Sequence, residues 1–511
     1  MINTAIRTYA NEYGGRAILL FLLFLLALYE FYSIGLGGFA AVCFIPAFIL
    51  FIILTFKYRM FLFWILFSYN YFVQFGEIPH PPLPMSLPNE MLQLSLLMIA
   101  LIDIKDNYWG RTKNIMILAI SIWCGFCTLE LLNDTCDIGI NIGAWYTGAR
   151  MLGFQLFYIS LVYCLYITSH KTLIQYLFLW ATLALFAVFW VYKQKYIGLT
   201  PSENAWLYYG AGNRTHLLQA GTLIRYWSIF SDAANFGIGM ASTGVAFVIF
   251  GITAKIRWLK FIFTIVGAAC IWAMFPSGTR TAIACLMAGF MAYIFLSKSF
   301  KIAIPFTIIF AVFAFILVFT KIGDGNQQIR RMRSAFDKKD ASANVRSMNQ
   351  AVMKKYLKDA PWGIGVGMGR EQVPANNKYS LMSTIAPDSE YVFIWIHTGI
   401  IGITIFLITT AMILIGACWI VFFKLKSPSL RGIGAGFCCA FVSQQLGAYG
   451  NQVLMQFPNG LVFYGGISIV FILPYIEDSW IEWETKKLAK QNEKKRLRLE
   501  KKKQSRVKTV F

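Results

Sequence analysis

The chain alternates long apolar runs with short polar connections, and within the runs hydrophobic and polar positions do not alternate as they would in the strands of a membrane barrel. Most of these runs approach the roughly 20 residues that a helix needs to cross a bilayer. The pattern therefore predicts an all-α polytopic membrane protein with about 14 transmembrane helices, or 12 to 14 if the shortest runs do not span. The predicted spans are 17–34, 38–56, 60–75, 91–104, 114–132, 151–168, 172–192, 236–254, 258–275, 281–296, 302–320, 400–423, 433–449 and 459–476.

Composition supports this reading, because 58% of the residues are hydrophobic and only 14% are charged. Soluble domains carry roughly a quarter charged residues, so a soluble globular protein is excluded. The first apolar run follows Arg7 and Arg16 and lacks a small-residue cleavage signature, which predicts a retained helix and no removed signal peptide. The run 91–104 is short, which leaves a re-entrant or interfacial segment open.

Lys and Arg fall on alternate short connections, which by the positive-inside rule are cytoplasmic. The connections at 35–37, 77–90 and 450–458 carry neither residue and are predicted to face outward. Both termini are then cytoplasmic. The positively charged connections hold Lys57, Arg59, Lys105, Arg111, Lys113, Lys171, Lys255, Arg257, Lys260, Lys298, Lys301, Lys424 and Lys426.

Two predicted outer loops, 193–235 and 321–390, are longer than the others, and extracytoplasmic function is expected there. The second has 12 Lys/Arg against 7 Asp/Glu, a net of +5, which suits either anionic lipid head groups or an anionic ligand. The predicted organisation is 1–200, N-terminal transmembrane helices; 201–320, transmembrane helices with arginine motifs; 321–390, a large periplasmic loop with short helices; 391–476, C-terminal transmembrane helices; and 477–511, a basic cytoplasmic tail.

The tail, 477–511, has 12 Lys/Arg against 6 Asp/Glu, a net of +6, and is expected to bind anionic membrane lipids. Binding of nucleic acid is not expected. The four histidines are widely separated and most of the ten cysteines lie in apolar spans, so we expect no metal. No phosphate-binding loop, dinucleotide fingerprint or serine-nucleophile elbow occurs, and we expect no cofactor.

Arginines beside small or polar residues recur at predicted helix ends. Arg280 lies in SGTRTA, with Ser277, at the start of an apolar helix, where free backbone amides and a guanidinium can hold phosphate oxygens together. Arg225 opens a segment that runs past Asn235. Arg346 lies on a predicted helix in which Val345, Met348, Val352 and Tyr356 form one stripe and which ends before Pro361. Glycines then alternate, including Gly365 and Gly367, and allow a tight turn and close approach of backbone to a ligand.

The order of these motifs resembles the O-antigen ligase and O-antigen polymerase superfamily of bacterial inner-membrane glycosyltransferases. The matching segments are 225–235, the Ser-x-x-Arg of Ser277 and Arg280, the run 346–367, and 388–402, in which a polar pair precedes Tyr and Gly-Ile-x-Gly. The resemblance implies a GT-C-like fold and metal-independent transfer of glycan from undecaprenyl diphosphate at the periplasmic face. It further implies that Arg225, Arg280 and Arg346 hold the diphosphate, supported by Asn235, Ser277, Gly365 and Gly367.

The resemblance also implies a polar catalytic group where the chain returns to the membrane. Ligases of the superfamily typically carry His-Asn there, whereas this chain has Asp388 and Ser389, which leaves polymerase at least as open as ligase. Candidates for the base are Asp388, Glu390 and His397. Asp388 is equally suited to capping the following helix.

The expected partners are an undecaprenyl-diphosphate-linked glycan donor and an acceptor that is a glycan, lipid A core or a protein. The last case would make the chain a protein O-oligosaccharyltransferase of the same superfamily. An alternative from another class is a lipid-linked oligosaccharide flippase, although polar residues in mid-span are sparse and no internal repeat is visible. The expected location is the bacterial inner membrane.

Overall fold

The computed structural model describes residues 57–78, 86–102, 108–218, 223–297, 341–385 and 389–508, with scattered residues in 15–53 and 304–333. It divides into two units, Met1–Ile65 and Leu66–Phe511. In the first unit, Phe21–Glu30 forms an apolar helix. The predicted spans 38–56 and 302–320 lie largely outside the described residues.

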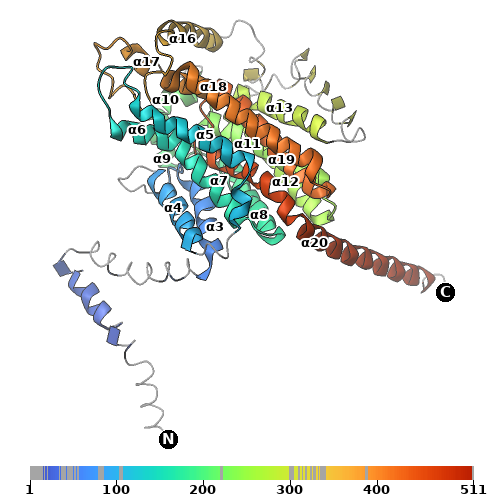
Figure 1. Cartoon of the computed structure of the whole chain (residues 1–511). Coiled ribbons are helices and arrows are strands. Elements are labelled where there is room, and N and C mark those ends of the chain that lie inside the picture. The colour runs from blue at the N-terminus through green and yellow to red at the C-terminus, as the bar shows by residue number, and fades with distance from the viewer. Residues whose placement is uncertain are drawn as a thin grey trace. The chain divides into compact units, whose positions relative to one another are not determined.

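The described part of the second unit is built almost entirely from helices, with one two-stranded hairpin (Figure 1). Helix α3, Arg59–Phe72, begins in the first unit and ends in the second. The other helices are α4 (Ser86–Ile102), α5 (Ile115–Leu129), α6 (Ile142–Ala149), α7 (Gln155–Tyr166), α8 (His170–Tyr192), α9 (Pro201–Tyr209), α10 (Asn213–His216), α11 (Ala233–Thr253), α12 (Arg257–Met274), α13 (Arg280–Leu296), α16 (Ala341–Leu357), α17 (Ser380–Thr384), α18 (Glu390–Trp419), α19 (Pro428–Gly450) and α20 (Asn459–Lys508). The hairpin strands are β1 (Leu217–Leu218) and β2 (Leu223–Ile224).

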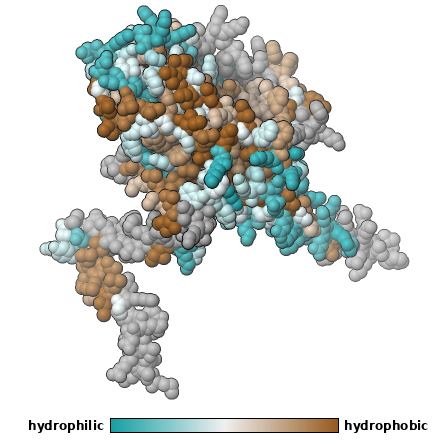
Figure 2. Space-filling view, viewed as in Figure 1, coloured by the Kyte–Doolittle hydropathy of each residue, from teal (hydrophilic) through white to brown (hydrophobic). Residues whose placement is uncertain are grey.

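Seven of the described helical segments are long and apolar enough to cross a membrane, as expected of an all-α membrane protein. Each predicted span within the described residues coincides with a helix. The short run 91–104 belongs to α4, which at 17 residues is just under the usual spanning length. Figure 2 shows apolar residues on the flanks of the helices and hydrophilic ones near α16 and α17 and along the end of α20.

Helix α11 lies at the centre of the second unit, packed against α12, α13 and α19. In the most apolar 18 residues of α11, 83% of the positions are buried, against 33% for α18, so α11 is the more enclosed of the two helices among the described residues. Small residues in AANFGIGMASTG let the neighbouring helices approach α11 closely. A side chain at Gly237 would overlap Ser277 Oγ, so glycine is needed where the start of α11 meets the turn before α13.

The first long loop, 193–235, folds into α9, α10 and the antiparallel hairpin, in which Leu217 pairs with Ile224 and Leu218 with Leu223. Its chain then enters α11, whose N-cap Asp232 accepts hydrogen bonds from the amides of Ala234 and Asn235. The hairpin and this cap determine where residues 225–232 lie.

The second long loop contains α16, as predicted around Arg346, but the face that α16 buries differs from the predicted stripe. Met348 is 68% exposed, whereas Met353 and Leu357 are buried against Ile364 and Ile396. The predicted stripe is thus buried only in part: Tyr356 packs against the buried cluster, Val352 is exposed, and the side chain of Val345 lies outside the described residues. Contact with the following turn and with α18 decides which helical face is buried, and local periodicity does not contain that contact.

The glycine turn after α16 is held against the start of α18. Gly363, Gly365 and Gly367 have φ of +76°, +102° and +83°, values that favour glycine. The amide of Ile364 donates to Ile396 O (2.9 Å) and that of Gly365 to His397 O (3.1 Å). A Cβ at Gly367 would overlap the Ala144 carbonyl of α6. In the structure these glycines therefore permit close approach of two backbones, and approach to a ligand stays a prediction.

Candidate active site

Arg225 follows β2 directly, and its guanidinium binds the turn that precedes α13. Its Nε donates to Ser277 O (3.2 Å), Nη1 to Thr215 O (3.1 Å) and Nη2 to Thr279 Oγ1 (3.1 Å). The hairpin fixes this position, because the Arg225 amide donates to His216 O (2.9 Å). Segments some 50 residues apart in sequence are thus joined at one guanidinium.

The turn before α13 is itself closely braced. Ser277 Oγ donates to Met274 O (2.6 Å) and accepts from the Thr279 amide (3.2 Å), while Gly278 adopts φ +57°. Thr279 Oγ1 donates to Ala233 O (2.8 Å) in the first turn of α11. Arg280 follows as the first residue of α13, where the helix dipole favours an anion.

A third arginine, Arg331, joins this turn from the second long loop. Its Nε donates to Gly278 O (3.0 Å), and the side chains of Arg331 and Arg225 both lie against Gly278. Sequence reasoning singled out Arg225 and Arg280 but missed Arg331. The sequence signal for it is the RRMR run at 330–333, which contributes to the net positive charge of the second long loop.

The three guanidiniums, here called the arginine cluster (Arg225, Arg280 and Arg331), are close enough to repel one another. Burial lowers the pKa of Arg225, Arg280 adds to this shift, and Asp232 opposes it. Burial together with Arg225 and Arg280 lowers the pKa of Arg331 to about 10. Arginine stays charged at neutral pH even so, and the cluster is a concentrated positive field that an anion would relieve.

Residues 451–458, between α19 and α20, tie the predicted site segments together. Asn451 Nδ2 donates to Thr281 Oγ1 beside Arg280 (3.0 Å), and the Leu454 amide donates to Glu390 Oε2 (3.1 Å). Ser231 Oγ donates to Gln456 Oε1 (3.0 Å). This short connection therefore contacts the starts of α13 and α18 and the segment before α11, and sequence reasoning gave it no role beyond facing outward.

Asn235 lies in the first turn of α11 and is fully buried. Its Nδ2 donates to Phe457 O (2.7 Å) and Ser231 Oγ (3.0 Å), and its own carbonyl accepts from Asn459 Nδ2 (2.7 Å). These bonds join α11 to α20 and support the segment that carries Arg225. Asn235 therefore holds the backbone of this segment in place.

Two of the three candidate bases are described. Glu390 is buried at the first position of α18 and accepts from the Leu454 amide, which suits it to holding residues 453–455. His397 Nδ1 lies 3.0 Å from Gly365 O and its ring packs on Phe393 (4.4 Å between centroids). Both side chains thus have structural partners. Asp388 lies outside the described residues.

Of the remaining predicted residues, Arg346 lies on α16, but its side chain falls outside the described part of the structure. The predicted meeting of Arg346 with Arg225 and Arg280 therefore stays a prediction. Gly365 and Gly367 lie in the clamped turn, where Gly365 is in contact with His397. In the described part of the chain, no group of three His, Cys, Asp or Glu is placed to hold a metal ion.

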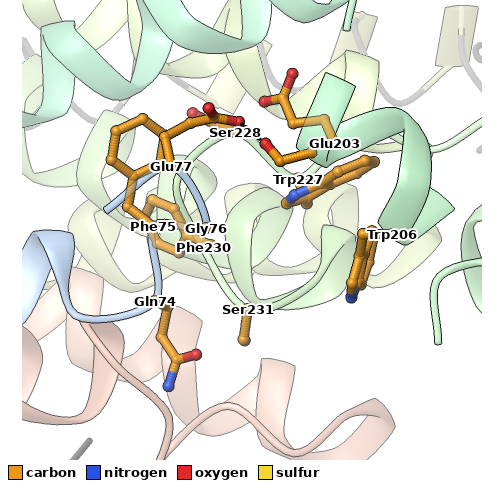
Figure 3. A pocket seen from close by; sticks show the side chains of 11 residues that line it. Gln74, Phe75, Gly76, Glu77, Glu203, Trp206, Trp227, Ser228, Phe230 and Ser231 are labelled. Carbon is orange, nitrogen blue, oxygen red and sulfur yellow. Dashed lines mark hydrogen bonds between the residues drawn. The ribbon is translucent and has the colours of Figure 1, made fainter. Parts of the chain in front are cut away.

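A cavity of about 280 Å³ opens beside the segment that follows Arg225 (Figure 3). Residues from three parts of the second unit line it: Gln74, Phe75, Gly76, Glu77, Ser202, Glu203, Trp206, Trp227, Ser228, Phe230 and Ser231. The indoles of Trp206 and Trp227 lie 4.4 Å apart between centroids. An edge of His216 packs on both rings, and burial with Arg225 lowers the pKa of His216 to about 3, so it is neutral.

Comparison with known proteins adds one finding. Residues 265–407 match the sequence model of a family described as O-Antigen ligase. No curated protein matches the chain. The matched stretch contains Arg280, Arg331, Arg346, the glycine turn and the start of α18, and it leaves out Arg225. Residues 265–407 are thus similar to the O-antigen ligase family, which confirms over this stretch the resemblance predicted from the motifs.

Proposed function

We propose that this protein is a membrane glycosyltransferase that polymerises or ligates undecaprenyl-diphosphate-linked glycan at the periplasmic face of the bacterial inner membrane. The observation that carries the proposal is the arginine cluster at the start of α13, of which Arg280 and Arg331 lie inside the region of the chain that matches O-antigen ligases. Three cations gathered beside one helix N-terminus suit a diphosphate better than a neutral ligand.

The chemistry needs little more than positioning and charge. The acceptor oxygen forms a bond to the anomeric carbon of the donor glycan while the bond from that carbon to diphosphate oxygen breaks. The electron pair leaves with the diphosphate, and the cluster stabilises this developing charge. The hydroxyl proton passes to a base, for which Asp388, Glu390 and His397 are the candidates.

Within the cluster the three arginines have different tasks. Arg225 uses three nitrogens to bind Ser277 O, Thr215 O and Thr279 Oγ1, so it chiefly positions the turn that presents Arg280. Arg331 Nε donates to Gly278 O, so this arginine reaches the same turn from the second long loop. We assign the direct contacts with diphosphate to Arg280, at the N-terminus of α13, and to Arg331, which lies against the turn before it, and we assign a positioning role to Arg225.

The test is Arg280→Lys, which keeps the charge and removes the planar fork. Loss of one preorganised donor to a developing charge costs about 100-fold to 1,000-fold in rate. We expect transfer of lipid-linked glycan in proteoliposomes to fall by that factor while the protein inserts normally. Arg214→Lys, at an exposed arginine of α10, is the matched control. Wild-type transfer by Arg280→Lys would contradict the proposal.

We also propose that anionic lipids bind at the opposite end of α12. A groove of about 460 Å³ there is lined by Trp258 and by six cations, Arg257, Lys487, Lys490, Lys494, Lys495 and Arg498. The pair Lys255 Nζ to Glu484 Oε2 (3.2 Å) holds α20 against this end. The span Arg257–Ser277 has 21 residues, so the groove and the cluster lie about 30 Å apart, one bilayer core. Purified protein with Lys487, Lys490 and Lys494 changed to Gln should retain less cardiolipin; equal retention would refute this site.

A further inference from the structure

The cavity beside the arginine cluster combines an aromatic wall with a polar rim. Figure 3 shows the Trp206 and Trp227 indoles on one side of it, with Gln74 and Phe75 across from them. Gly76, Glu77, Ser202 and Glu203 complete the lining together with residues of the segment that follows Trp227. The volume of about 280 Å³ is at the small end of ligand sites, which run from about 300 to 1,000 Å³.

The two carboxylates of the lining are in different states. Glu203 is saturated: it accepts from Lys193 Nζ (2.9 Å), Trp190 Nε1 (2.8 Å), Gln194 Nε2 (2.7 Å) and the Thr200 amide (2.8 Å). Glu77 is exposed, and its Oε1 accepts from the hydroxyls of Thr200 and Ser202. Its Oε2 makes no hydrogen bond to the described residues. The cavity is therefore lined by one carboxylate, Glu77, that the hydroxyls of Thr200 and Ser202 hold through a single oxygen.

The aromatic wall and the carboxylate of the cavity favour a sugar over an anion or a wholly apolar ligand. A second anion is disfavoured because Glu77 and Glu203 already line the cavity. A wholly apolar ligand would leave the Glu77 oxygen and the Gln74 amide without partners as it displaced water. A sugar ring satisfies both halves, since its C–H face can pack on an indole while adjacent hydroxyls donate to a carboxylate and bond to an amide.

The cavity is also in the right place for the glycan of a lipid-linked substrate. Trp227 is two residues after Arg225, so their Cα atoms are at most about 7 Å apart. At the other end of the segment, Ser231 bonds to Gln456 of the 451–458 connection, which reaches Thr281 beside Arg280. A diphosphate at the cluster would have its sugar chain within reach of the indoles.

We propose that the cavity lined by Trp206, Trp227 and Glu77 is a saccharide subsite that holds one uncharged sugar ring close to the reacting bond. This inference rests on the proposed transfer function. The sugar belongs either to the donor glycan or to a glycan acceptor, and both would be recognised by the same aromatic face and carboxylate.

Binding and transfer are tested separately. The probe for binding is the oligosaccharide repeat released from the surface polysaccharide of the source strain, observed by saturation-transfer NMR on the full-length protein in detergent. We expect binding by wild type and by Arg280→Ala, which lacks transfer. Glu77→Gln should bind about tenfold to a hundredfold more weakly, because a charge-assisted bond is lost while Gln can still accept from Thr200 and Ser202. Trp206→Ala should abolish binding, and Trp419→Ala, which changes an exposed indole at the end of α18, is its control.

Trp206 packs on His216 and Trp227, so Trp206→Ala could lose binding by disturbing this packing. Its result is therefore interpreted only together with that of Glu77→Gln, which disturbs no packing. In the transfer assay, a raised KM for the lipid-linked donor assigns the ring to the donor, and a raised KM for acceptor assigns it to the acceptor. Unchanged binding and unchanged KM in Glu77→Gln would overturn the subsite even if Arg280→Lys is inactive. Oligosaccharide binding that Glu77→Gln loses would support the subsite even if Arg280→Lys retained transfer, in which case the proposed function alone would fail.

Discussion

Replacing Arg331 by Gln should reduce activity without reducing stability, since the arginine cluster is built at a cost to the fold. A pKa lowered from 12.5 to about 10 corresponds to roughly 3 kcal/mol against the charged form of Arg331. Arg331 is partly exposed, and solvent screening reduces this to about 1 to 2 kcal/mol. The hydrogen bond to Gly278 O returns about 1 kcal/mol. The two contributions nearly cancel.

The effect of Arg331 on stability depends on pH. Between about pH 10 and 12.5 the unfolded chain binds the Arg331 proton more tightly than the native chain, so stability rises with pH there. Below about pH 10 the full cost is present and constant. At neutral pH, Arg331→Gln removes both this cost and the bond to Gly278, so its melting temperature should stay within about 3 °C of wild type.

Two measurements check this. Differential scanning fluorimetry of purified protein gives the melting temperature, and a glycan-transfer assay should show a loss of about 100-fold or more. Pyrophosphate, as an anionic probe, should raise the melting temperature of wild type more than that of the variant. Arg330→Gln, at the exposed neighbour, should match wild type in both assays. A large drop in melting temperature would make Arg331 a structural residue, and full activity at normal stability would remove it from the site.

Three further predictions address the base, the topology and pH. If Asp388 is the base, Asp388→Asn should abolish glycan transfer and His397→Ala should only weaken it. If Asp388 is instead a helix cap, Asp388→Asn should be tolerated. Normal glycan from both variants at normal protein levels would exclude this segment from the mechanism. A single cysteine introduced at Ser342 should be labelled by a membrane-impermeant maleimide in intact cells, and labelling only after permeabilisation would refute the outer placement of 321–390. Because the His216 pKa is lowered to about 3 from 6.5, the free energy of unfolding should fall as pH drops below about 6.5, by roughly 2 kcal/mol at pH 5. The variant His216→Gln can still accept from the Ala233 amide and should lose this pH dependence. An unchanged pH profile in that variant would rule out His216 as the source of the dependence.

Much of the architecture follows from sequence alone, because spans and their ends are local properties. The apolar runs predicted the helices at 114–132, 172–192 and 236–254, where α5, α8 and α11 lie. The Ser277 to Arg280 motif correctly predicted a helix beginning at Arg280, and the order of motifs identified the family that residues 265–407 match. Each of these depends on residues that are neighbours along the chain.

Tertiary structure decided what those helix ends meet. Arg331 reaches Gly278 across 53 positions, and the 451–458 connection meets Ser231 across more than 200, so neither periodicity nor motif spacing contains these contacts. The same holds for the cavity, whose rim at Glu77 and wall at Trp206 and Trp227 come from separate segments. The sequence shows an excess of Lys and Arg in the second long loop, but it does not show which of them lies at the turn before α13. The tertiary structure places Arg331 there, because the position of a guanidinium depends on the backbone carbonyl that it binds.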